Sequence, residues 1–151
     1  MNTFTRIFLL LALALGSVAL SAAARPDFSG EWELNLQKSD LGGAPITKLN
    51  AHIDHKDPVF KYTAKAVTNG QDFEESGTIL TDGKPTQDSR GAMVKAHWEN
   101  TILVVETSAA DGSPLDEARM TLSEDGKTMI RDYVLKSGDA GQKRHEVYDK
   151  R

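Results

Sequence analysis

Arg131 and Tyr133 form the pair with the clearest chemical potential in this sequence, because they stand two positions apart in a stretch with strand-like alternation. Successive side chains of a strand point to opposite faces, so residues two apart share a face. If Met129 and Tyr133 point inward, Arg131 does too, and its buried guanidinium needs an internal acid, a hydroxyl network or an anionic ligand. In the alternative register, Ile130 and Val134 point inward and Arg131 is solvated.

Four histidines are candidate metal ligands, because neutral imidazole binds transition metals. His52 and His55 stand three positions apart in an expected strand, so they point to opposite faces and share a metal ion only if the chain bends early. With Asp54, His97 and His145 they keep a metal site open as a lesser alternative. The simpler interpretation, exposed strand histidines, predicts no metal and no cofactor.

Motifs of catalysis are absent from the sequence. It contains no Cys, no G-x-S-x-G nucleophile elbow, no H-E-x-x-H pair and no phosphate-binding G-x-x-x-x-G-K-[ST] loop. Glu74 with Glu75, and Asp116 with Glu117, are adjacent in sequence, so on a strand each pair diverges to opposite faces. Because a carboxylate dyad needs both groups on one face, we predict that the protein is not an enzyme.

The N-terminal segment has the pattern of a secretory signal peptide. Arg6 precedes an apolar stretch over residues 7–20, and residues 21–24 supply the small side chains of a cleavage site. An uncleaved anchor needs about 20 apolar residues to cross a bilayer, more than this stretch offers before the cleavage site. We therefore expect residues 1–24 to be a signal peptide, cut before Ala24 or Arg25. The mature protein is then periplasmic or secreted, without stable membrane insertion.

The remaining chain, residues 25–151, is expected to form a single domain. The sequence carries 18 basic residues, one of them in the leader, against 22 acidic residues. This acidic balance, without a basic stripe, disfavours nucleic acid as a partner. The absence of Cys excludes disulfide bonds, so the domain depends on its hydrophobic core.

Seven turn signals divide the domain at intervals of 12 to 17 residues. They are Asp57-Pro58, Asn69-Gly70, Asp82-Gly83, Glu99-Asn100, Asp111-Gly112, Asp125-Gly126 and Ser137-Gly138. Each interval fits one strand and a short turn, whereas a crossover to a parallel strand needs about a dozen residues by itself. The spacing therefore predicts a meander of antiparallel strands.

Alternation of apolar and polar residues supports about nine strands with one buried face each. They are expected at residues 28–36, 48–54, 60–66, 72–81, 92–98, 101–109, 115–123, 127–136 and 142–149, with a loop or broken helical turn at 37–47. A long meander hides its edges and its apolar face by closing into a barrel, so we expect an all-β, up-and-down barrel of about 8 to 10 strands. A two-sheet β-sandwich is the alternative.

Two short segments resemble the calycin superfamily, which includes the lipocalins and the fatty-acid-binding proteins. Phe28-Ser29-Gly30-Glu31-Trp32 is similar to their G-x-W opening, and Val147-Tyr148-Asp149-Lys150 looks like the close of a fatty-acid-binding protein. The resemblance implies a ligand-binding barrel with Gly30 and Trp32 at its floor. In those relatives an Arg two positions before the final Tyr reaches the ligand carboxylate, and this sequence has Glu146 there.

The expected function is binding of one small, mostly apolar ligand, such as a fatty acid, inside the barrel. The expected ligand-binding residues are Phe60, Tyr62, Phe73, Trp98, Met120, Arg131 and Tyr133. Small residues in the inward columns either leave a cavity or relieve crowding where the sheet closes. They are Ala51, Ala64, Ala66, Gly77, Ala92, Ala96 and Ala118.

Two alternatives to this function remain open. The first is a fully packed barrel that meets an envelope protein through an outward apolar patch. The patch would comprise Val67, Met93, Ile102, Val104, Ile130 and Val134. The second follows from the resemblance alone: some calycins bind zinc or haem, and His145 is the position implied for a haem ligand.

Overall fold

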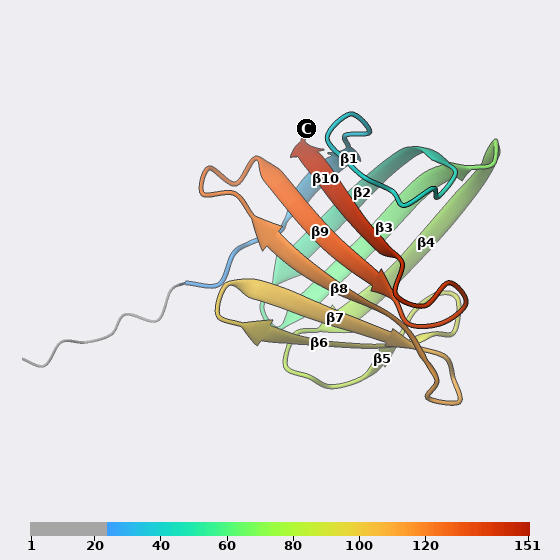
Figure 1. The fold of residues 1–151 in the computed structure, drawn as a ribbon. Coiled ribbons are helices and arrows are strands. Elements are labelled where there is room, and N and C mark those ends of the chain that lie inside the picture. Colours follow the sequence, from blue (N-terminus) through green and yellow to red (C-terminus); the bar gives the residue numbers. More distant parts are fainter. Residues whose placement is uncertain (1–23) are drawn as a thin grey trace, which may run out of the picture.

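The computed structural model describes residues 24–151, which form ten antiparallel strands (Figure 1). The strands are β1 (Gly30–Leu34), β2 (Ile46–Lys56), β3 (Val59–Thr68), β4 (Gln71–Leu80), β5 (Thr86–Gln87), β6 (Met93–Glu99), β7 (Ile102–Ser108), β8 (Pro114–Leu122), β9 (Thr128–Leu135) and β10 (Lys143–Lys150). Most of the expected signal peptide therefore lies outside the described residues. In the part that is described, no helix is long and apolar enough to cross a membrane.

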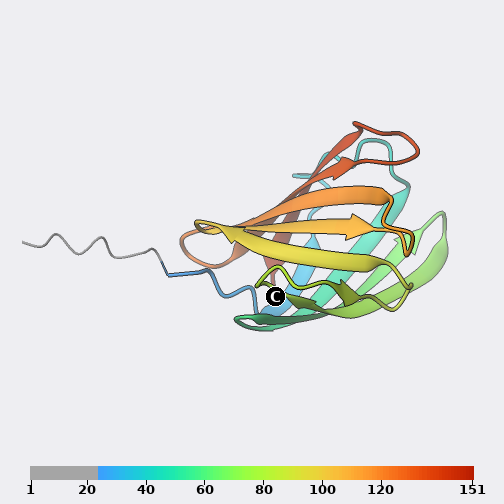
Figure 2. The same ribbon diagram turned by 90° about the horizontal axis from the view of Figure 1, so that it is seen from below.

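All ten strands belong to one sheet with the order β4-β3-β2-β1-β10-β9-β8-β7-β6-β5. Strands that follow one another in the chain are neighbours in the sheet, except for β4 and β5. In addition, β1 pairs with β10. The pairing of the first strand with the last rolls the meander into a nearly closed barrel (Figures 1 and 2). The barrel prediction is confirmed, and the two-sheet alternative is wrong because every strand joins the same sheet.

The barrel closes at a seam between β4 and the segment that follows β5. Two hydrogen bonds bridge the seam: the Ser89 amide donates to the Ser76 carbonyl, and the Ser76 amide donates to Ser89 Oγ, each at 3.0 Å. A third joins the Gly83 amide to the Ala96 carbonyl at 2.8 Å. These contacts hold the end strands of the sheet together where they form no ladder.

All seven predicted turn signals lie in connections between strands, except that Glu99 is the last residue of β6. Asn69 and Gly70 have φ values of 52° and 73°, the left-handed conformation that a two-residue hairpin turn requires and that Asn and Gly adopt most readily. The sequence missed only β5, because two residues beside Pro85 are too few to show a period.

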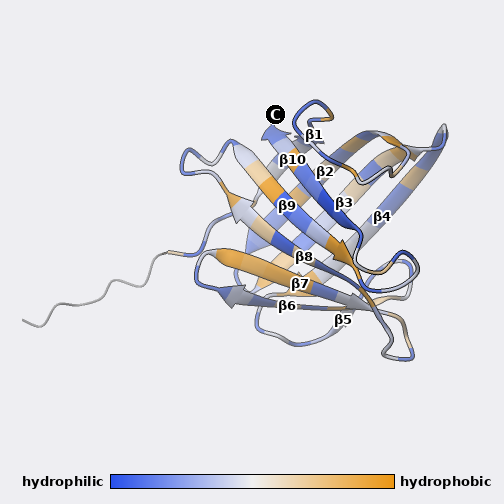
Figure 3. Cartoon of the chain, in the orientation of Figure 1, coloured by the Kyte–Doolittle hydropathy of each residue, from blue (hydrophilic) through white to orange (hydrophobic). Residues whose placement is uncertain are grey.

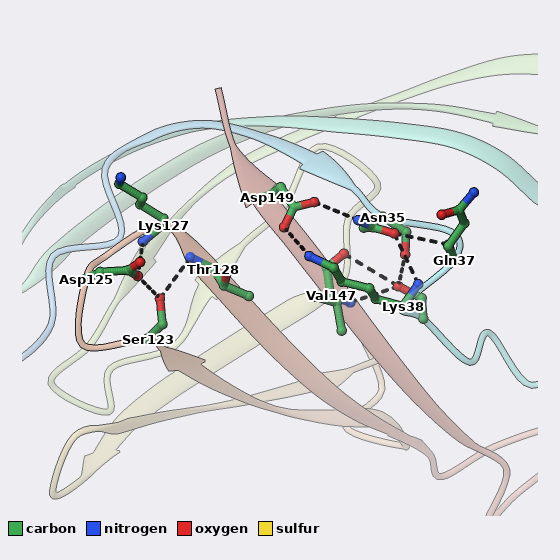
Figure 4. Close-up of polar contacts among 10 residues, drawn as sticks. Asn35, Gln37, Lys38, Ser123, Asp125, Lys127, Thr128, Val147 and Asp149 are labelled. Atoms are coloured by element: carbon green, nitrogen blue, oxygen red, sulfur yellow. Dashed lines mark hydrogen bonds and ion pairs between the residues drawn. The ribbon is translucent and has the colours of Figure 1, made fainter.

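The connection between β1 and β2, residues 35–45, is a loop that lies against β10. The loop predicted at 37–47 therefore extends two residues too far, because β2 already begins at Ile46. Ser39 Oγ accepts a hydrogen bond from the Val147 amide at 2.9 Å, and Asp149 binds both Asn35 and Lys38 (Figure 4). Val147 points outward yet is only 5% exposed. On the neighbouring hairpin, Asp125 accepts from Ser123 Oγ at 2.6 Å and stabilises the turn.

An aromatic cluster of Phe28, His55, Phe60 and Trp98 fills one end of the barrel, with ring centroids 5.3 to 6.2 Å apart. Trp32 packs beside it, 1% exposed, and donates its indole N–H to the Phe28 carbonyl at 2.8 Å. Trp32 is thus a core side chain with its polar atom satisfied. The cluster closes this end, which we call the closed end.

Candidate functional site

A cavity of about 280 Å³ lies inside the barrel, between the closed end and the opposite end. Its walls near the closed end are apolar and include Ile53, Phe60, Ile79, Met120 and Met129. The rest of the lining mixes two kinds of side chain. Ten are titratable, namely Tyr62, Glu75, Asp88, Arg90, Asp116, Arg131, Tyr133, Arg144, Glu146 and Tyr148, and others are apolar, among them Ile46, Leu49, Ala66 and Phe73. The interior therefore has an apolar end and a mixed, partly charged end. Phe73, which is 45% exposed, marks where the cavity reaches the surface.

The structure brings together six of the seven residues expected to bind ligand. Phe60, Tyr62, Phe73, Met120, Arg131 and Tyr133 all line the cavity. The expectation that Trp98 lines the same space is wrong. Trp98 lies near the end of β6, where its ring stacks on Phe28 at 6.2 Å and its indole N–H donates to Asp57 at 2.9 Å. The Trp98 side chain points inward as expected, but it lies at the closed end, so it contacts the aromatic cluster and not the cavity.

The small inward residues serve both of the roles that the sequence left open. Ala51, Ala64 and Ala66 line the cavity, whereas Ala96 and Ala118 are buried in the packed core. Gly77 allows the Tyr62 ring to lie against the backbone of β4, since a Cβ there would stand 2.9 Å from Tyr62 Cε1.

Arg131 points into the barrel and pairs with Glu146, directly opposite it on β10. Nη1 of Arg131 lies 3.1 Å from Oε2 of Glu146, and the Tyr148 hydroxyl donates to the same oxygen at 2.8 Å. Burial favours the neutral form of Arg131, but the Glu146 charge raises its pKa above the ordinary value, so the guanidinium stays charged. Burial together with Glu146 raises the pKa of Tyr148. The sequence required an internal acid, a hydroxyl network or an anionic ligand beside a buried Arg131. The structure supplies the internal acid, Glu146.

Arg144 is a cavity residue that the sequence analysis did not single out. It lies opposite Tyr133 in the ladder, with its guanidinium carbon 5.4 Å from the ring centre. Its Nε is buried without a hydrogen-bond partner, and no ion pair joins it to another described residue. Its sequence signal is a period of two, since Arg144 stands two positions before Glu146 and four before Tyr148. Residues 142–149 are polar on both faces, which hides this period.

A second ionic cluster lies beside the seam. Arg90 pairs with Asp88 at 2.9 Å and with Glu75 at 3.3 Å, and the Tyr62 hydroxyl donates to Glu75 at 3.0 Å. Burial alone would raise the pKa of Asp88, but hydrogen bonds from Arg90 and the Ala92 amide hold it below its usual value. The cluster ties β4 to the loop after β5, and it was not predicted because β5 was not.

The adjacent acidic residues diverge as predicted. Glu75 and Asp116 line the cavity, while Glu74 pairs with Lys65 and Glu117 with Lys136 on the outside. Among residues 24–151, no three carboxylate, His or Cys side chains are grouped so as to hold a metal ion.

The histidines also separate as expected for their spacing. His52 is exposed beside Glu31, whereas His55 is buried in the aromatic cluster, so the expectation that all four are exposed is wrong for His55. His97 lies near Glu99 at 3.5 Å. His145 is exposed and bonds Asp132 at 2.7 Å, away from the cavity.

The outward apolar residues do not face one another across the ladders. Their cross-strand partners are mostly polar: Val67 lies between Lys48 and Asp72, and Val134 between Lys143 and Glu117. Figure 3 shows the longest apolar run on β7, yet Val104 in that run is 3% exposed. Ile130 alone of the six has an apolar ladder partner, Val147.

Protein-family models and curated protein sequences give no match to this chain. Its function is therefore inferred from the cavity and the residues that line it.

Proposed function

We propose that the barrel binds one small, mostly apolar ligand with a polar head, of the fatty-acid type, without transforming it. The observation that carries the proposal is the cavity lining: apolar walls at the closed end and a mixture of titratable and apolar side chains beyond them. Burial of a hydrocarbon tail at the apolar end stabilises the complex by about 0.8 kcal/mol per CH₂. A few convergent polar groups orient the head group.

The cavity volume restricts the ligand to a compact molecule. Small-molecule sites usually measure roughly 300 to 1,000 Å³, and about 280 Å³ lies just below this range. A medium-chain acid or alcohol fits this size better than a long-chain fatty acid. With the expected signal peptide, these features support an exported binding protein of calycin type.

Calorimetric titration of residues 25–151 with decanoic acid tests this function. Ala64→Phe adds a ring inside the cavity, and Thr63→Phe adds the same ring on the neighbouring residue, whose side chain points outward. We expect decanoic acid to bind the unmodified domain and the Thr63 variant, and binding to be lost in the Ala64 variant. Equal binding to both variants, with both still folded by circular dichroism, would place the ligand outside the barrel.

A further inference from the structure

The three arginines that line the cavity differ in whether their charge is already paired. Arg131 is paired with Glu146, and Arg90 with Asp88 and Glu75. Arg144 forms no ion pair within the described part of the chain, and its Nε is buried without a partner. A buried guanidinium nitrogen left without an acceptor is costly, so this group is the one prepared to accept a new partner.

The ladder between β9 and β10 places Arg144 at a defined depth. Tyr148 lies opposite Met129, Glu146 opposite Arg131, and Arg144 opposite Tyr133, which makes three successive inward layers. With about 3.4 Å per residue, Arg144 is roughly 14 Å along the strand from the Tyr148 layer. Met129 belongs to the apolar end, so the unpaired charge lies at the opposite end of the lining.

We propose that Arg144 binds the carboxylate of the ligand, whose tail then occupies the apolar space near the closed end. This assignment rests on the binding function proposed above and gives the ligand a direction, tail first. A guanidinium fork matches a carboxylate bidentately. The Tyr133 ring, which both Arg131 and Arg144 flank, keeps the fork within the lining.

The charges around Arg144 favour a monocarboxylate over a phosphate. Asp116 and Glu146 line the same cavity; Glu146 is paired with Arg131, whereas Asp116 forms no ion pair with another described residue. Asp116 therefore repels any anionic ligand, and it repels a doubly charged phosphate about twice as strongly as a singly charged carboxylate. Of these two head groups, the carboxylate loses less of its attraction to Arg144.

The test compares decanoic acid, 1-decanol and decyl phosphate on the intact mature domain. Arg144→Gln removes the inward charge, and Lys143→Gln removes the same charge from the preceding, exposed residue of β10. We expect Arg144→Gln to weaken decanoic acid roughly ten- to hundredfold, as loss of a charge-assisted hydrogen bond implies. The affinity for 1-decanol should stay unchanged, and Lys143→Gln should affect neither ligand.

The outcomes separate this assignment from the proposed function. If the unmodified domain binds neither the acid nor the alcohol, the binding function itself is refuted. If it binds both equally, or if Arg144→Gln weakens both alike, binding stands and Arg144 is not the anchor. Tighter binding of decyl phosphate than of decanoic acid would overturn the carboxylate assignment. Arg144→Lys, which keeps the charge without the fork, should restore part of the acid preference, and urea unfolding checks that each variant folds.

Discussion

Arg131 and Glu146 face each other across the β9–β10 ladder inside the barrel, 3.1 Å apart. In the fatty-acid-binding proteins that the sequence resembles, a ligand-binding Arg stands at the position of Glu146, and here the Arg is on the neighbouring strand. The Glu146 carboxylate thus pairs with the Arg131 guanidinium, to which the carboxylate of a ligand would otherwise bind. This internal pair is why we assign the ligand carboxylate to Arg144.

Removing Arg131 should destabilise the fold more than removing the whole pair. Arg131→Met leaves the Glu146 carboxylate, 3% exposed, without its counter-charge, which typically costs about 3 to 5 kcal/mol. Arg131→Met combined with Glu146→Gln should recover much of this loss, since no unpaired charge remains. Urea unfolding of the three proteins measures both effects, and a double variant no more stable than Arg131→Met would show that the pair is not coupled.

Trp32 should contribute more to stability than the other tryptophan. Truncation of a fully buried aromatic side chain costs about 3 to 5 kcal/mol, and Trp32 also has its indole N–H bonded to the Phe28 carbonyl. Trp98 lies in a less buried position at the closed end. Denaturant midpoints for Trp32→Ala and Trp98→Ala should therefore differ, with the larger drop for Trp32. A loss below about 1 kcal/mol for Trp32→Ala would contradict its core role.

Much of this architecture follows from turn chemistry and alternation. Asn69-Gly70 and Asp125-Gly126 are turn sequences whatever surrounds them, so the meander was predictable from local signals. The partners of side chains were not, because they depend on which residues meet across a ladder. The Arg131–Glu146 pair joins positions 15 residues apart, and only the register shows that they are opposite. Trp98 was misplaced for the same reason: alternation gives its direction but not its depth.

Gly77 should control the position of Tyr62 and thereby the cavity. A Cβ at this position would stand 2.9 Å from Tyr62 Cε1 and 3.1 Å from its hydroxyl, so Gly77→Ala must move the ring. The displaced ring loses its hydrogen bond to Glu75 and takes up cavity space. We expect decanoic acid to bind about tenfold more weakly, the effect of roughly 1.4 kcal/mol. Thr78→Ala, at the adjacent exposed position, is the control, and unchanged binding in Gly77→Ala would mean that the ring does not bound the ligand site.

Cleavage of the leader can be tested on protein exported by its own secretion route. The short apolar stretch followed by Ala22, Ala23 and Ala24 predicts that the mature chain begins at Ala24 or Arg25. N-terminal sequencing of the soluble envelope or culture fraction checks the start. Recovery of Met1 in the membrane fraction would instead indicate an uncleaved anchor.

Stability should fall as the pH drops below neutrality because of His55. Its side chain is 3% exposed, and Nδ1 accepts the Phe28 amide at 3.3 Å, which requires a neutral ring nitrogen. Burial lowers the pKa of His55 below its ordinary 6.5, against the opposing charges of Asp27 and Asp57. Near pH 6.5, His55 therefore takes up a proton in the unfolded chain but stays neutral in the folded protein. This contribution to stability is complete above that pH and decreases as the pH falls toward the folded pKa.

The carboxylates beside His55 act in a different range. Side-chain and backbone hydrogen bonds from Ser29 lower the pKa of Asp27, so its contribution to stability is lost only as the pH falls below the ordinary 3.8.

The role of His55 is tested by substitution. His55→Asn keeps an acceptor near the Phe28 amide but does not titrate, and His52→Asn is the exposed control. Urea unfolding between pH 5 and 8 should show a smaller pH slope for His55→Asn and an unchanged slope for His52→Asn. Identical slopes for His55→Asn and the unmodified domain would show that another group causes the acid sensitivity.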